Sequence, residues 1–326
     1  MRRIVFRAMV VLILCASGTA AAETKRILIV SDSWGMQLTS ENYDRFPSHD
    51  VFENVLAANG LPDIGVQGAK TARGGRSSAF WAKPENLAVI VSELKDYPTI
   101  DIVHLITGGI DFLDALLNED FTLKTDAERD AVWESVKANI ETIVNTCLDV
   151  RDTIRVVLAD YDYVDHERME GPPINFDFHS VTVLQFNTWF VELGRKKLQI
   201  ARNTPRCEYV QNWGTLQYWF GDPPHSVPYP GAAPNYDPYP GGDITSPWPA
   251  SMAPDGVHPT DEAHAKMLQN AMDQYYNAWL TAESSASVSW TPLITMLGVA
   301  FFVSMTAVAK WKLKAKKAAR IGLKSV

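Results

Sequence analysis

The sequence predicts an α/β fold built on a parallel sheet. Between residues 23 and 280, short β-branched runs alternate with longer stretches of helical apolar spacing, which is the pattern of βαβ units. Most of the short runs are nearly continuous in apolar residues, as strands are when helices cover both faces of a sheet. A chain of 326 residues with 46% hydrophobic and 21% charged residues can bury one large core.

Five segments have the composition of strands, at 26–30, 64–67, 102–107, 153–159 and 207–210. Helical spacing, with capping residues at several starts, predicts helices over 48–59, 85–95, 126–148, 181–201 and 261–279. The interval 222–254 is rich in Pro, Gly and Tyr and predicts a long irregular loop. Its aromatic residues either line a substrate cleft or belong to a plain surface insertion.

The first 22 residues have the three regions of a secretory signal peptide: a basic start, an apolar run and small residues ending at Ala22. We expect cleavage after Ala22. An uncleaved anchor is the alternative, although the apolar run is shorter than the roughly 20 residues of a spanning helix. Cys147 and Cys207 would then lie in an oxidising compartment, where a disulfide between them is left open.

A second targeting signal lies at the other end. After a Ser/Ala-rich linker at 281–287, residues 288–309 form an uncharged stretch of 22 residues, the length of a membrane-spanning helix. A buried core helix is the alternative. The basic tail 310–326 would lie in the cytoplasm, which makes the domain extracytoplasmic, either periplasmic or on the cell surface. With a net charge of −8 and a basic tail, the domain itself is acidic, which argues against a nucleic-acid partner.

Two motifs carry the candidate chemistry. A predicted strand runs into a turn of small residues that presents Ser33 at its carboxyl end, where α/β sheets keep their active sites. Asp255 and His258 stand three residues apart before a predicted helix. In a tight turn this carboxylate can fix the imidazole tautomer whose other nitrogen accepts the serine proton. The alternatives are a helix N-cap for Ser33 and an ordinary turn for the other two residues.

These blocks resemble those of the SGNH hydrolase family, also called GDSL-like lipases and esterases. Ser31-Asp32-Ser33 is similar to the family's Gly-Asp-Ser block, with Ser31 in place of the glycine, and Asp255-Gly-Val-His258 matches its Asp-x-x-His block. The resemblance covers about 26–279. It implies a flavodoxin-like three-layer sandwich with a parallel five-stranded sheet, and a catalytic triad of Ser33, Asp255 and His258.

The resemblance also implies an oxyanion hole made by the backbone N–H groups of Ser33 and Gly75, with Gly74 as a close alternative to Gly75. Residues 107–111 are similar to the family's Gly-x-Asn-Asp block, but Ile110 stands where the family has its oxyanion asparagine. An isoleucine side chain cannot donate a hydrogen bond, and losing one such donor typically costs about 10²–10³ in rate. Asp111 is expected to be structural and to hold the nucleophile turn.

The sequence therefore predicts a serine esterase that hydrolyses carboxylic esters through an acyl-enzyme. No cofactor or metal is needed, and no metal-ligand spacing joins His104, His225 and His264. Small-molecule, lipid or glycan esters are the expected partners, with cell-envelope esters as candidates. The alternative is a membrane-anchored domain with weak or no catalysis that binds envelope polysaccharide. Ile110 and the aromatic-rich loop favour that alternative, whereas the intact triad favours the esterase.

Overall fold

The computed structural model describes residues 24–39, 50–118, 122–169, 181–230, 242–245, 249 and 251–281. Its five strands form one sheet: β1 (Thr24–Ser31), β2 (Ile64–Gln67), β3 (Ile102–Ile106), β4 (Arg155–Ala159) and β5 (Cys207–Val210). The order is β2-β1-β3-β4-β5, and every neighbouring pair is parallel. This is the flavodoxin-like order of a doubly wound sheet, so the predicted fold class is confirmed.

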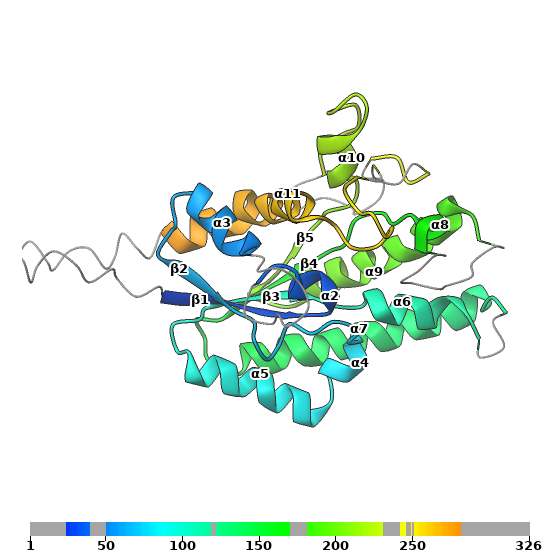
Figure 1. Cartoon of the computed structure of the whole chain (residues 1–326). Helices are drawn as coiled ribbons and strands as arrows, with labels where there is room; N and C mark the ends of the chain where they lie inside the picture. Colours follow the sequence, from blue (N-terminus) through cyan, green and yellow to red (C-terminus); the bar gives the residue numbers. More distant parts are fainter. Residues whose placement is uncertain are drawn as a thin grey trace, which may run out of the picture. The chain divides into compact units, whose positions relative to one another are not determined.

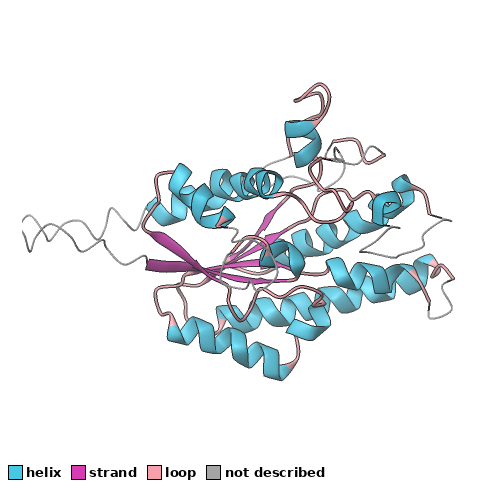
Figure 2. Ribbon diagram, in the orientation of Figure 1, coloured by secondary structure: helices cyan, strands magenta, loops and turns pink. Residues whose placement is uncertain are grey.

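Helices cover both faces of the sheet, which gives three layers (Figures 1 and 2). One face carries α3 (Val51–Ala58) and α11 (Asp261–Ala271), and the other carries α5 (Pro84–Asp96), α7 (Asp126–Leu148) and α9 (Val183–Asn203). Short helices complete the described chain: α2 (Ser33–Met36), α4 (Ser78–Trp81), α6 (Gly109–Leu116), α8 (His166–Met169) and α10 (Thr215–Phe220).

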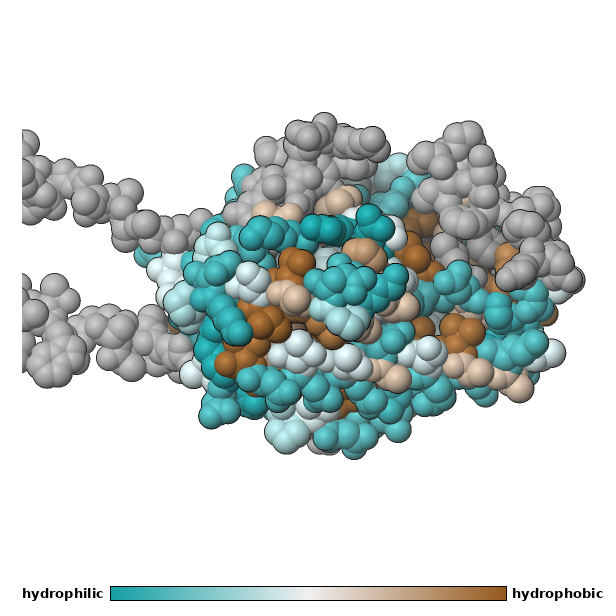
Figure 3. Space-filling view, turned by 90° about the horizontal axis from the view of Figure 1, so that it is seen from below, coloured by the Kyte–Doolittle hydropathy of each residue, from teal (hydrophilic) through white to brown (hydrophobic). Residues whose placement is uncertain are grey.

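The core lies where the apolar strands meet these helices. Residues 27–30 of β1 are fully buried, as are the central residues 156–158 of β4. Helix α7 begins at a capping box in which Thr125 and Glu128 satisfy each other's backbone N–H groups. The outer surface on the side of α4 and α5 is mainly hydrophilic (Figure 3), as expected where each helix buries only one apolar stripe against the core.

The two cysteines that remain after the predicted signal peptide are buried free thiols. The disulfide that the sequence left open between Cys147 and Cys207 is therefore not formed in the structure. Burial raises the pKa of the Cys147 thiol to about 12, which leaves it protonated and unreactive at neutral pH.

The chain divides after Gln274 into two compact units, and the sheet belongs to the first. Helix α11 runs into a π-helical turn, Met272–Tyr276, and Thr281, predicted as the first linker residue, is still helical.

The predicted signal peptide, membrane helix and basic tail lie outside the described residues. In the ranges that are described, no helix is long and apolar enough to cross a membrane.

Candidate active site

The turn after β1 holds Ser33 in a fixed position. The backbone N–H of Asp32 donates to the Ile106 carbonyl of neighbouring β3, and Ser33 begins helix α2. The N-cap of α2 is Asp32, whose carboxylate accepts a hydrogen bond from the Trp34 N–H at 3.0 Å. The capping role considered for Ser33 thus falls to its neighbour, and the Ser33 hydroxyl is left for other partners.

A glycine two residues after Ser33 lets the strand pass into this helix. A Cβ built on Gly35 would lie 2.3 Å from Ser31 Oγ and 2.4 Å from Ser31 Cβ. Ser31 is completely buried at the end of β1 and cannot swing into solvent. The serine that replaces the family's glycine at position 31 therefore makes a glycine at position 35 necessary.

We expect Gly35→Ala to lower the free energy of unfolding by about 1–3 kcal/mol, the usual cost of overpacking a filled site. Urea denaturation followed by circular dichroism measures this change. Adding Ser31→Gly removes the two nearest obstructing atoms and leaves Ile29 Cγ2 at 3.0 Å, so it should recover most of the lost stability. If the loss of stability in the double variant equals the sum of the losses in the two single variants, the contact with Ser31 is not the cause.

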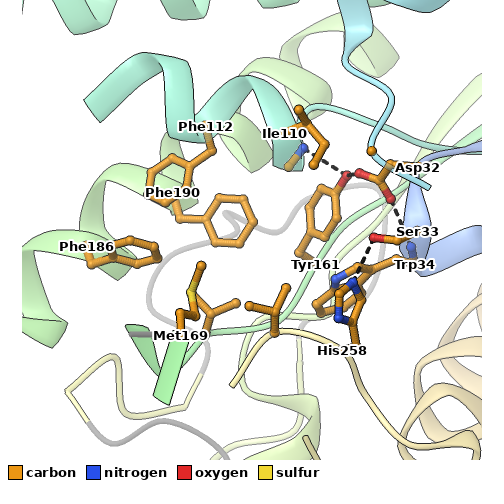
Figure 4. Close-up of a pocket in the computed structure, with 14 residues that line it drawn as sticks. Asp32, Ser33, Trp34, Ile110, Phe112, Tyr161, Met169, Phe186, Phe190 and His258 are labelled. Atoms are coloured by element: carbon orange, nitrogen blue, oxygen red, sulfur yellow. Dashed lines mark hydrogen bonds between the residues drawn. The ribbon is translucent and has the colours of Figure 1, made fainter. Parts of the chain in front are cut away.

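Asp255 and His258 lie in the turn that precedes α11, and they meet Ser33 across the carboxyl edge of the sheet. His258 Nδ1 is 2.6 Å from Asp255 Oδ2, and His258 Nε2 is 2.9 Å from Ser33 Oγ. Asp255 Oδ1 also accepts the backbone N–H groups of Val257 and His258, at 2.9 and 2.7 Å. The structure thus brings the three predicted catalytic side chains into one chain of hydrogen bonds, part of which is visible in Figure 4.

Two carboxylates of this region have pKa values that are shifted in opposite directions. Partial burial raises the pKa of Asp255, but hydrogen bonds from His258 and Val257 outweigh it and bring the pKa down to about 2. Complete burial raises the pKa of Asp32 to about 6, against the lowering effect of bonds from Tyr161 and Trp34. Asp255 is therefore ionised at neutral pH and can stabilise an imidazolium at His258.

Two backbone N–H groups beside Ser33 can receive a developing oxyanion. Gly74 and Gly75 are close to Ser33, since a Cβ built on Gly74 would lie 3.7 Å from Ser33 Cβ. The Gly74 N–H points at the sulfur of Met36, 3.1 Å away. The N–H groups of Ser33 and Gly75 have no hydrogen-bond partner among the described residues. This difference favours Gly75, in its left-handed conformation (φ +68°), as the second donor.

The segment after β3 differs from the expectation. Asp111 accepts hydrogen bonds from the N–H and Oγ of Ser78, at 2.6 and 2.7 Å, so it ties α6 to α4 and does not hold the nucleophile turn. That turn is held by Tyr161, whose hydroxyl donates to Asp32 and accepts from the Gly109 N–H. Tyr161 was not among the predicted site residues, although its place two residues after a predicted strand puts it at the carboxyl edge of the sheet.

A cavity of about 270 Å³ opens beside Ser33 and His258. Most of its wall is apolar and comes from α6, α8, α9 and the segment after β4: Ile110, Phe112, Val164, Met169, Phe186 and Phe190. Ile110 therefore faces the cavity from the position of the family's asparagine. None of the described residues of the loop 222–254 lines it.

Part of that loop packs on helix α10 instead. His225 and Tyr229 meet Tyr218 of α10 edge to face, with ring centroids 4.4 and 4.9 Å from that of Tyr218. This arrangement favours the surface-insertion interpretation for the part of the loop that is described. Across the described ranges, no group of three or more His, Cys, Asp or Glu side chains is placed to hold a metal ion.

No protein-family model matches the chain, and no curated protein sequence matches it significantly. Among solved structures it is similar to a variant of an acetyl-xylooligosaccharide esterase from Geobacillus, with 15% identity, 78% of this chain and 96% of that chain covered, and a TM-score of 0.43. A psychrotrophic esterase from Pseudoalteromonas is 14% identical (79% and 99% covered, TM-score 0.43).

A lipase/acylhydrolase from Enterococcus faecalis is 15% identical (76% and 95% covered, TM-score 0.43). At these identities and TM-scores the similarity carries no information on the activity of this chain. What the chain does chemically has to follow from the groups around Ser33.

Proposed function

We propose that the chain is a serine esterase that hydrolyses carboxylic esters through an acyl-enzyme on Ser33. The observation that supports this best is the continuous hydrogen-bond chain from Asp255 through His258 to Ser33 Oγ, which ends at an apolar cavity. A nucleophile, a base and a group that orients the base are the minimal parts of such a site.

The geometry supports the following sequence of steps. His258 Nε2 takes the Ser33 hydroxyl proton while Oγ attacks the ester carbonyl, and the carbonyl oxygen becomes an oxyanion that accepts from the Ser33 and Gly75 N–H groups. The intermediate collapses, its C–O bond breaks, and His258 gives the proton to the leaving alcohol. Water then repeats the cycle on the acyl-enzyme and releases the acid. Asp255 stabilises the imidazolium throughout.

The oxyanion hole sets a limit on the rate. Ile110 supplies no side-chain donor, and the Tyr161 hydroxyl already donates to Asp32. With two backbone donors only, we expect turnover to be about 10²–10³ slower than with a third donor in place.

The cellular setting stays a proposal drawn from sequence. The signal peptide, the membrane helix 288–309 and the basic tail would place the esterase outside the cytoplasm, tethered to the membrane. Esters of cell-envelope glycans or lipids are substrates that such a site could reach. The second candidate, an anchored polysaccharide-binding domain, is favoured by Ile110 alone, because the described aromatic residues of the loop lie away from the cavity.

Hydrolysis of p-nitrophenyl acetate and butyrate by the purified full chain tests the proposal. We expect saturable release of p-nitrophenol and loss of activity after treatment with a serine-directed fluorophosphonate. A folded protein that neither hydrolyses these esters nor reacts with the reagent would contradict the esterase and favour the binding domain.

A further inference from the structure

We infer that the site selects esters of medium-length apolar acyl groups, about six to ten carbons long, and buries the acyl chain in the cavity beside Ser33. The inference rests on the proposed function. It depends on the shape and polarity of the acyl cavity, defined here by Ile110, Phe112, Val164, Met169, Phe186 and Phe190.

The acyl cavity is polar at one end and apolar at the other. Figure 4 shows Ser33, His258 and Asp32 together at one side, while Phe112, Phe186 and Met169 lie at the opposite side. An ester carbonyl at Ser33 would therefore direct one substituent toward the phenylalanines. Because the reacting acyl carbon stays on the enzyme after the alcohol leaves, the acyl chain is the substituent that an apolar wall suits.

Among the described residues, the side chains at the deep part of the acyl cavity offer no free group to pair with a polar substituent. Beyond Asp32, Ser33 and His258 at the reactive end, Tyr161 is the polar side chain that lines the cavity, and its hydroxyl is already bonded to Asp32 and to the Gly109 N–H. Its ring packs against Phe190 at a centroid distance of 5.2 Å. Burying a hydroxyl, a sugar or a charge against these rings would leave it without a hydrogen bond, which is unfavourable. The wall thus discriminates against polar acyl groups.

The aromatic wall is fixed before any substrate arrives. Phe112 stacks on Phe190 at 4.5 Å and meets Phe186 edge to face at 4.6 Å. All three side chains are at most 4% exposed, so two helices, α6 and α9, hold them in place. A wall packed in this way cannot collapse to fill the space, and the volume remains available to a ligand.

The volume sets the chain length. A cavity of about 270 Å³ is somewhat less than twice the roughly 150 Å³ of an engineered apolar cavity that binds benzene, a molecule of six carbons. On that scale it accommodates a straight chain of about eight to ten carbons. Ile110 contributes to this wall from the position at which the resemblance predicted an asparagine. An isoleucine at this position therefore removes a donor from the oxyanion hole and also extends the apolar surface of the cavity.

The test is a series of p-nitrophenyl esters from acetate to palmitate, hydrolysed by the full chain. Each methylene that leaves water should raise kcat/KM by up to about fourfold, giving about 100-fold or more between acetate and octanoate. Beyond about ten carbons we expect no further gain. A profile that is flat, or that falls from acetate onward, overturns the inference.

Two matched variants locate the selectivity in the acyl cavity. Val164→Phe fills the space and should lower the ratio of kcat/KM for octanoate to that for acetate at least tenfold, since two excluded methylenes already account for about this factor. Leu184→Phe adds the same ring on α9 at a side chain that is 45% exposed and outside the wall, and it should leave both substrates unchanged. Equal effects of Val164→Phe on acetate and octanoate would contradict the inference but leave the esterase intact, whereas no hydrolysis of any ester by the wild-type chain would overturn both.

Discussion

Replacing Ser33 by alanine is expected to lower kcat for p-nitrophenyl butyrate by about 10⁴- to 10⁶-fold. The variant lacks the oxygen that lies 2.9 Å from His258 Nε2, so no acyl-enzyme can form. His258→Ala should cost a similar factor, because an unactivated serine hydroxyl is a weak nucleophile. The double variant should lose little more than either single variant, since the residues act as one unit. Initial rates on the purified proteins measure all three.

The matched control is Ser31→Ala, which removes a hydroxyl two residues away whose one hydrogen bond among the described residues goes to the backbone carbonyl of Asp32. Its rate should stay within about an order of magnitude of wild type, because no catalytic contact is lost. Circular dichroism of each variant verifies the fold. A folded Ser33→Ala protein that retains more than a few per cent of the wild-type rate would exclude Ser33 as the nucleophile.

Asp255→Asn should lower kcat by about 10⁴-fold with little change in the turn. The asparagine oxygen can still accept the Val257 and His258 N–H groups that Asp255 Oδ1 accepts now. Its NH₂ group, however, would donate to His258 Nδ1, which leaves the proton on Nε2 and prevents that nitrogen from accepting the serine proton. A variant that keeps more than one tenth of the rate would show that Asp255 does not orient His258.

The same substitution has a predicted effect on acid stability. The pKa of Asp255 is lowered from 3.8 to about 2 in the folded chain, so the folded state binds fewer protons than the unfolded state between these values. Its ionised form stabilises the fold above pH 3.8, and this contribution is lost as the pH falls through about 2. The difference in unfolding free energy between wild type and Asp255→Asn should therefore shrink from pH 5 to pH 2. A constant difference over this window would contradict a lowered pKa of Asp255 in the folded chain.

The sequence predicted the sheet well because its strands are short, apolar and bounded by turns. All five expected segments are strands in the structure, and every neighbouring pair is parallel, as the sequence predicted. The three candidate catalytic residues were found because each lies in a local motif, a turn after a strand or an Asp-x-x-His turn. The structure places them within hydrogen-bond distance, and their catalytic role stays a prediction.

Contacts between distant segments could not be predicted in the same way. Tyr161 reaches Asp32 across 129 residues of sequence, and neither residue alone signals the other. The acyl cavity combines apolar side chains from α6, α8 and α9 that are indistinguishable in sequence from ordinary core residues. Asp111 was assigned to the nucleophile turn because of its motif, but the Ser78 hydroxyl and N–H that it contacts lie on α4, outside that motif.

Covalent labelling of the full chain by a fluorophosphonate, with the adduct located by peptide mass spectrometry, most directly tests whether Ser33 is an activated nucleophile. The expected result is one adduct, on Ser33, that forms in wild type and Ser31→Ala and is absent from Ser33→Ala and strongly slowed in His258→Ala. An adduct on another residue, or a folded protein that stays unlabelled, would contradict the proposed esterase.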